Sequence, residues 1–166
     1  MLICPDHKRP DCSCQWEVAG TYRASPRPSK LYVAASSTQL SRAAEFMRLA
    51  RIAGWTITLD WVEVVRSNGG VANPSDVDRD VVAGWARADM DAVTAADVVV
   101  LLAPSDTSPA RGAFVELGVA LACDKPVLAV ADPGCASIFL ALATESVASD
   151  AEAHAQLARW ARDGLR

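Results

Sequence analysis

The sequence predicts an α/β fold in which a parallel sheet of about five strands is wound with helices on both faces. Two observations lead to this prediction. Short runs of apolar residues, typical of strands that are buried on both sides, recur along the chain. Longer segments with apolar residues at helical spacing separate these runs, and polar loops join them. A regular alternation of strand and helix indicates successive β-α-β units, which form a parallel sheet.

The composition describes one ordinary globular domain with an appended arm. At 166 residues, of which 51% are hydrophobic, the chain can bury a core of its own. Residues 1–29 contain four of the nine prolines and have no periodicity, so we expect a poorly ordered arm there and the folded domain over residues 30–166. Thiol and imidazole groups in the arm either form a small zinc knuckle or are incidental. Their spacing, C-x2-H-x4-C-x-C, matches no common structural zinc site, so we predict no metal at Cys4, His7, Cys12 and Cys14.

Charge and apolar runs exclude two classes of partner. The formal net charge is −4 and acidic and basic residues are interspersed, so we expect no nucleic-acid polymer as a partner. No apolar run reaches the length that a membrane-spanning helix needs, so we expect no membrane. The first twelve residues lack the apolar core of a secretory signal, and an odd number of cysteines, five, suits a reducing compartment. We therefore expect a cytoplasmic protein.

The first part of the domain is predicted to hold two strands, a helix and a loop. The apolar run LYVAA at 31–35 suits a central strand. The hydroxyl-rich turn SST at 36–38 can cap a helix over 39–53, which a glycine ends. The run WTITL at 55–59 is the second strand. The segment 60–70 ends in SNGG, which is typical of a loop.

The second part continues the alternation. A helix is predicted over 74–95, with three aspartates near its positive amino end, and the run DVVVLLA at 97–103 is the third strand. The remaining elements are a helix, two strands and an amphipathic closing helix, at 112–123, 126–130, 146–148 and 151–162. Five such strands fit the flavodoxin-like order 2-1-3-4-5, in which the first and third strands end side by side at the switch point. The serine turn and the loop before helix 112–123 should therefore meet.

Glu116 is the only charged side chain in the run GAFVELGVALAC, from Gly112 to Cys123. A helix that is apolar nearly all round is expected to be buried on more than one side. Carboxylates are rarely buried unless they are paired or functional. Gly118, which weakens the helix, indicates that a backbone or a ligand comes close there. The alternative is a half-exposed helix from which Glu116 points to solvent.

The expected meeting place gathers hydroxyls, carboxylates and one arginine, namely Tyr32, Ser36, Ser37, Asp89, Asp91, Ser105, Ser108, Arg111, Gly112 and Glu116. Two carboxylates in such a cavity suit cleavage of a glycosidic bond, one attacking the anomeric carbon and the other protonating the leaving group. A helix amino end with Arg111 suits an anion such as a 5′-phosphate. No glycine-rich dinucleotide or triphosphate loop is present, so we expect no cofactor.

Each of these residues can also be interpreted as having only a structural role. Arg111 can pair with a surface acid, and Ser36 and Ser37 can be helix caps alone. Tyr32 can belong to the core, and Trp61 can anchor a loop instead of stacking on a base. Asp89 can be a solvated helix residue.

Four segments together resemble the nucleoside 2-deoxyribosyltransferase family, which includes 2′-deoxynucleoside 5′-phosphate N-hydrolases and phage-encoded members. These segments are LYVAASS, WTITLDW, DMDAVTAADVVV and RGAFVELGVALACDKPV, and they span about residues 30–130. The resemblance implies that Glu116 is a nucleophile that forms a glycosyl–enzyme ester, and that Asp89 contacts the base and helps to protonate it. It also implies that Tyr32 and Gly112 belong to the substrate pocket.

The sequence departs from that family at two places. Ala110 stands where transferases of free nucleosides have aspartate and phosphate-using hydrolases have serine, and Phe114 replaces a glycine. We predict an enzyme that cleaves or transfers at the N-glycosidic bond of a nucleoside or its 5′-monophosphate, with Trp61 and Ser108 among its substrate contacts, and a homo-oligomer (dimer or higher). The alternatives are an inactive nucleotide-binding or sensing module on the same fold, and an interaction protein whose apolar helix forms an oligomer interface.

Overall fold

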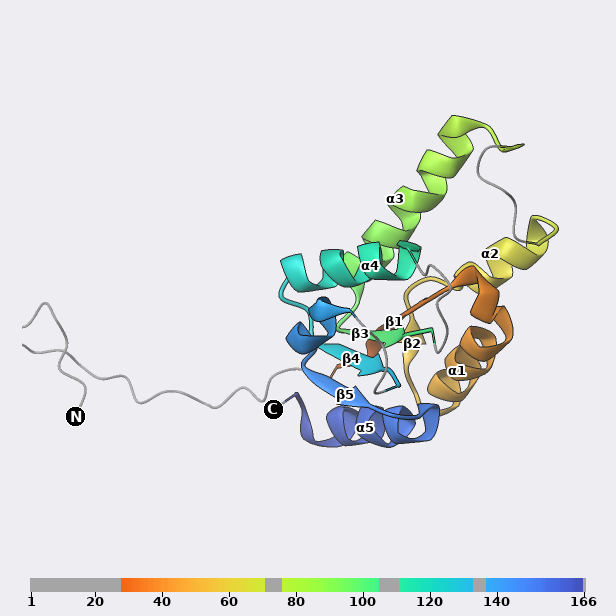
Figure 1. The fold of residues 1–166 in the computed structure, drawn as a ribbon. Helices are drawn as coiled ribbons and strands as arrows, with labels where there is room; N and C mark the ends of the chain where they lie inside the picture. Colours follow the sequence, from red (N-terminus) through yellow and green to blue (C-terminus); the bar gives the residue numbers. More distant parts are fainter. Residues whose placement is uncertain (1–27, 71–75, 105–110, 133–136, 166) are drawn as a thin grey trace, which may run out of the picture.

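The computed structural model describes residues 28–70, 76–104, 111–132 and 137–165 (Figure 1). The predictions for the amino-terminal arm and its cysteines lie outside the described residues, except for Pro28 and Ser29. So do those for Ser105, Ser108 and Ala110.

Five parallel strands form one sheet in the order β2-β1-β3-β4-β5, which confirms the predicted fold class and strand order. The central strands are apolar and completely buried, as expected for a sheet that helices cover on both faces. The strands are β1 (Lys30–Ala35), β2 (Thr56–Ile57), β3 (Val98–Leu102), β4 (Val127–Val130) and β5 (Glu145–Val147).

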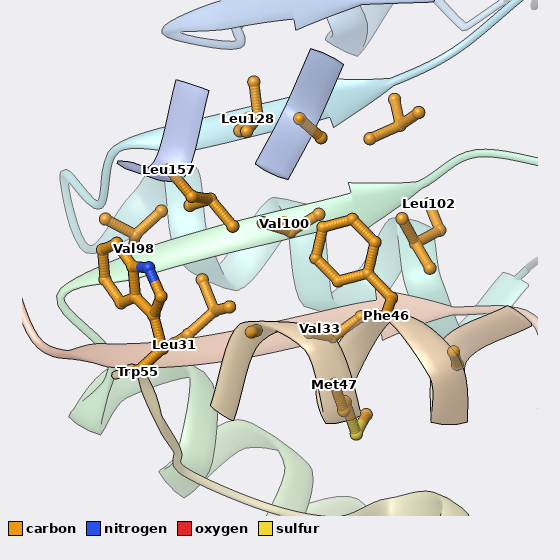
Figure 2. Close-up of a cluster of buried hydrophobic side chains, with 14 of the residues drawn as sticks. Leu31, Val33, Phe46, Met47, Trp55, Val98, Val100, Leu102, Leu128 and Leu157 are labelled. Atoms are coloured by element: carbon orange, nitrogen blue, oxygen red, sulfur yellow. The ribbon is translucent and has the colours of Figure 1, made fainter. Parts of the chain in front are cut away.

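Helices α1 (Leu40–Ile52) and α5 (Asp150–Asp163) cover one face of the sheet, whereas α3 (Arg79–Ala95) and α4 (Arg111–Ala122) cover the other (Figure 1). Phe46 and Leu157 reach the first face from α1 and α5 and pack on Val33 and Val100 (Figure 2). The second face packs the inner residues of α3 and α4 against Tyr32 and its neighbours. Each face therefore has its own hydrophobic core.

The segment 60–70, which the sequence indicated was a loop, forms helix α2 (Trp61–Ser67). Asp60 caps this helix, because its side chain accepts a hydrogen bond from the Glu63 N–H at 3.1 Å. Val62 is the buried residue of this helix. The glycines that suggested a loop, Gly69 and Gly70, have φ angles of 83° and 111° and only end the helix.

Other boundaries differ by a few residues. Helix α3 begins at Arg79 and not at residue 74, because Asp78 is its cap and accepts from the Asp80 N–H at 2.8 Å. The second strand is shorter than expected, since the chain soon turns toward the Asp60 cap. A 3-10 helix at Ile138–Leu142 was not predicted.

Helix α4 is buried on one side only, so the expectation of burial on more than one side is wrong for the described chain. Ala113, Leu117 and Ala120 are buried, but Val115 is 62% exposed. A side chain at Gly118 would meet nothing within 4 Å among the described residues, so no close approach within the chain explains that glycine. The outward side of α4 is therefore apolar, and no described residue covers it. No helix in the described ranges is long and apolar enough to cross a membrane.

Candidate active site

A cavity of about 510 Å³ lies where helices α2, α3 and α4 approach the carboxyl end of β1. The turn after β1 and the first turns of α4 line one part, and α2 with the outer half of α3 lines the rest. In Figure 1 that half of α3 extends beyond the sheet, and only Ala92 and Val93 of the helix are buried. The lining residues are Ala35, Ser36, Ser37, Leu59, Trp61, Val64, Val65, Asn68, Gly70, Trp85, Ala88, Asp89, Arg111, Gly112, Ala113 and Glu116.

Glu116 lines this cavity from α4, so the solvent-facing alternative does not describe it. Its Oε2 atom is inaccessible to solvent and has no hydrogen-bond partner among the described residues. Burial, with a further contribution from the charge of Asp89, raises the pKa of Glu116 to about 8. At neutral pH the Glu116 carboxyl therefore holds its proton in the ligand-free protein.

Asp89 reaches the same cavity from α3. Its Oδ1 atom accepts a hydrogen bond from the Tyr32 hydroxyl at 3.3 Å. Burial raises the pKa of Asp89, and the hydrogen bond from Tyr32 partly opposes that rise. Asp91, which we expected at the same place, is exposed and does not line the cavity. Two residues along a helix turn the side chain by about 200°, so Asp91 points away from Asp89.

Tyr32, which we expected in the pocket, is completely buried and does not itself line the cavity. It points from β1 into the core that α3 and α4 cover. Burial first, and then the nearby charges of Glu116 and Asp89, raise the pKa of Tyr32, so its hydroxyl stays protonated and remains a donor. Tyr32 is thus both a core residue and the group that links the two carboxyls.

The serine turn and the amino end of α4 form the polar part of the cavity wall. Ser36 does act as a cap, since its Oγ atom accepts from the Thr38 N–H at 3.3 Å, yet Ser36 and Ser37 also line the cavity. Arg111 is exposed beside Gly112 and makes no ion pair with a described acid. The alternative in which Arg111 pairs with a surface acid is therefore not found among the described residues.

Two tryptophans form the apolar part of the wall. The Trp61 indole N–H donates to the Val33 carbonyl at 2.8 Å, which fixes the ring at the cavity. Trp85 comes from α3, and we did not predict it as a site residue. It lies four residues before Asp89 and so on the same helix face, a signal that the sequence contained. Among the other lining residues that we did not predict, Val64 and Val65 belong to α2, the segment interpreted as a loop, and Asn68 and Gly70 follow it directly.

Among the described residues no group of three or more histidine, cysteine, aspartate or glutamate side chains could hold a metal ion. The chemistry that these residues offer consists of two carboxyls with raised pKa values, a buried hydroxyl donor, and an aromatic wall. Carboxyls in such an arrangement can attack an electrophilic carbon and donate a proton to a leaving group.

Comparisons with known proteins give only distant similarity, and only to solved structures. No protein-family model and no curated protein sequence matches the chain. Among solved structures, the CMP N-glycosidase BcmB of Clostridium botulinum matches with 14% sequence identity and a TM-score of 0.49, over 78% of this chain and 98% of that chain. A similarity at this level carries neither residue roles nor a substrate from one protein to the other.

Proposed function

We propose that this protein cleaves or transfers at the N-glycosidic bond of a (deoxy)nucleoside or its 5′-monophosphate. The observation that carries the proposal is the pair of carboxyls, Glu116 and Asp89, which line one cavity. The charge of Asp89 contributes to the raised pKa of Glu116, and the Tyr32 hydroxyl donates to Asp89. The sequence resemblance to nucleoside 2-deoxyribosyltransferases supports the same chemistry.

In the proposed reaction Glu116 is the nucleophile. The proton that Glu116 holds in the empty cavity passes to Asp89, and the Glu116 carboxylate attacks the anomeric carbon. The bond from that carbon to the base nitrogen breaks, and the base leaves with the proton that Asp89 donates. The product is a glycosyl ester on Glu116. Water or a second base then attacks the anomeric carbon, releases Glu116 and returns a proton to Asp89. Two displacements retain the configuration of the sugar.

Tyr32 supports both carboxyls in this scheme. Its hydroxyl donates to Asp89 Oδ1 and lowers the pKa of Asp89, and the same hydroxyl, lying near Glu116, lowers the pKa of Glu116, in both cases against the effect of burial. As the sugar gains positive charge in the transition state, ionisation of Glu116 becomes more favourable still. A buried carboxyl that is neutral in the empty cavity is therefore ready to ionise when the substrate supplies the opposite charge.

Arg111 favours a 5′-monophosphate over a free nucleoside. Its guanidinium is unpaired among the described residues, and it stands with Ser36, Ser37 and Gly112 where N–H groups at a helix amino end are available to an anion. A hydrogen bond to a charged group contributes about 1.5–3 kcal/mol, which corresponds to about ten- to a hundredfold in selectivity.

A base-release assay tests the proposal. Purified protein is incubated with each common deoxynucleoside and its 5′-monophosphate, and free base is measured by chromatography. We expect release, faster from the monophosphates, and loss of release in Asp89→Asn but not in Asp91→Asn, the matched control on the same helix. A protein that binds the monophosphates and releases no base is a sensing module instead. Equal rates for nucleoside and monophosphate contradict the role of Arg111.

The expected homo-oligomer stays a prediction. The outward side of α4, with Val115 62% exposed, is an apolar surface available for self-association.

A further inference from the structure

The cavity has two ends with different chemistry. What we infer from this difference rests on the proposed function. The end at the sheet carries Ser36, Arg111, Asp89 and Glu116, and the end between α2 and α3 carries mainly apolar side chains. If the carboxyls act on the bond between sugar and base, and Arg111 holds the phosphate, then the base must occupy the apolar end. The walls of the cavity at that end are Trp61, Val64, Val65, Trp85 and Ala88.

Asn68 is the side-chain amide at that apolar end, where helix α2 finishes. Its Nδ2 atom donates to the Val64 carbonyl at 2.7 Å, and its backbone N–H donates to the same oxygen at 3.2 Å. A carbonyl can only accept, so the nitrogen of the amide must face Val64. The Oδ1 atom therefore remains as an acceptor for a ligand.

The indole N–H groups of Trp61 and Trp85 cannot distinguish a base with an exocyclic amino group from a base with a carbonyl. The Trp61 N–H already donates to the Val33 carbonyl at 2.8 Å. The Trp85 N–H can donate to a ring nitrogen or carbonyl of a base, but amino and oxo bases both offer such acceptors. Of the described side chains that line the apolar end, Asn68 alone presents an acceptor that can distinguish an exocyclic amino group from a carbonyl.

We propose that Asn68 selects substrates whose base carries an exocyclic amino group, so that cytosine and adenine nucleotides are preferred to uracil and hypoxanthine nucleotides. An amino group donates a hydrogen bond to Oδ1, whereas a carbonyl in the same place sets two acceptors against each other. A neutral hydrogen bond contributes about two- to twelvefold, and the repulsion of the oxo base adds to it. Because Asn68 is exposed at the rim, water competes, and we expect about a tenfold preference.

The test compares two pairs of monophosphates that differ mainly at this group, dCMP with dUMP and dAMP with dIMP. For each we measure kcat/KM for base release, and the dissociation constant for the Glu116→Gln variant by calorimetry. The wild type is expected to favour dCMP and dAMP about tenfold in kcat/KM, and Glu116→Gln to bind them about tenfold more tightly. Asn68→Leu loses the preference by weakening the amino substrates, and Asn68→Asp, which keeps an acceptor, retains it.

The ratio of amino to oxo substrate separates selection from a merely structural role. Damage to α2 slows both members of a pair equally and leaves the ratio unchanged, so an unaltered ratio in Asn68→Leu overturns the proposal. Equal kcat/KM and equal binding within both pairs for unsubstituted Asn68 also overturn it. Preferential binding without any base release supports the role of Asn68 and contradicts the proposed reaction. Failure of all four monophosphates to bind overturns both.

Discussion

The two faces of the sheet have different roles, although the same strands form both. In β1, Leu31 and Val33 point to the face under α1 and α5, whereas Tyr32 and Ala34 point to the face under α3 and α4. The alternation of side chains along a strand thus divides one short apolar run between two cores. One of those cores supports the fold, and the other also carries the candidate site.

The face under α1 and α5 is closed by apolar packing. Phe46 stacks on His154 with ring centroids 4.1 Å apart, and Arg42 joins the two helices through Asp150 at 2.6 Å. The face under α3 and α4 holds Glu116 and Asp89, whose pKa values burial raises. Burying ionisable groups lowers the stability of the fold, and such groups cluster at functional sites. Substitutions on the two faces should therefore have opposite consequences.

The largest expected effect is the loss of activity in Glu116→Gln. Removing a nucleophile lowers kcat by at least about a thousandfold, because glutamine cannot form the glycosyl ester. The free energy of unfolding should not fall, since an amide needs no ionisation in a site that disfavours charge. Base release measured by chromatography and unfolding in urea check the two parts.

The control for this variant is Glu63→Gln, at an exposed glutamate on α2 that does not line the cavity. It should keep both activity and stability. Turnover near the wild-type rate in Glu116→Gln would remove Glu116 from the proposed mechanism. Unfolding of that variant would mean that Glu116 is a structural partner.

A smaller effect, on stability and not on activity, is expected for Phe46→Ala. Phe46 is 1% exposed, and removing its ring leaves a cavity that lowers the free energy of unfolding by about 3–5 kcal/mol. The kcat of the folded protein should not change, because the ring lies on the face away from the site. Urea unfolding, and kcat measured well below the unfolding midpoint, check this expectation.

Phe139→Ala is the matched control, since Phe139 is 54% exposed and its loss should change stability by about 0.5 kcal/mol or less. A fall of kcat in folded Phe46→Ala would show that the two faces are coupled across the sheet.

This difference between the faces also explains what the sequence could predict. Strand order follows from apolar runs such as VVVLL at Val98–Leu102, whose burial on both faces leaves a strong pattern. The meeting of the Glu116 helix with the serine turn follows from that order alone. The apolar end of the cavity could not be predicted, because α2 is short, has only Val62 buried, and ends in residues that are typical of loops.

The exposure of the outward side of α4 could not be predicted, for a different reason. Hydrophobicity along a helix indicates which faces avoid water, but it does not tell whether the same chain covers them. Val115 is as apolar as a core residue and is nevertheless exposed. The helix is apolar nearly all round as expected, but the described part of the chain buries only one side of it.

The smallest expected effect is a shift in pH dependence, and it distinguishes the faces without altering their packing. Glu116 must be ionised to attack while Asp89 must keep the proton that it donates, so kcat/KM should rise with pH as the pair of carboxyls loses one proton and fall as it loses the second, near the Glu116 pKa of about 8. Tyr32→Phe removes the hydroxyl that lowers the pKa of both carboxyls, so the whole profile should move to higher pH. The rate at the maximum should fall by about tenfold or less, since Tyr32 positions the carboxyls and does not react.

The stability of the fold should fall as pH rises. Between the ordinary value of 4.5 and about 8, folded Glu116 keeps a proton that the unfolded chain releases, so this contribution to stability is complete below 4.5 and is lost as pH rises through 8. Unfolding in urea across this range should give a declining free energy in wild type and a smaller decline in Glu116→Gln. An equal slope in wild type and Glu116→Gln would mean that Glu116 is ionised in the folded protein at neutral pH, and that it needs no proton loss before it attacks.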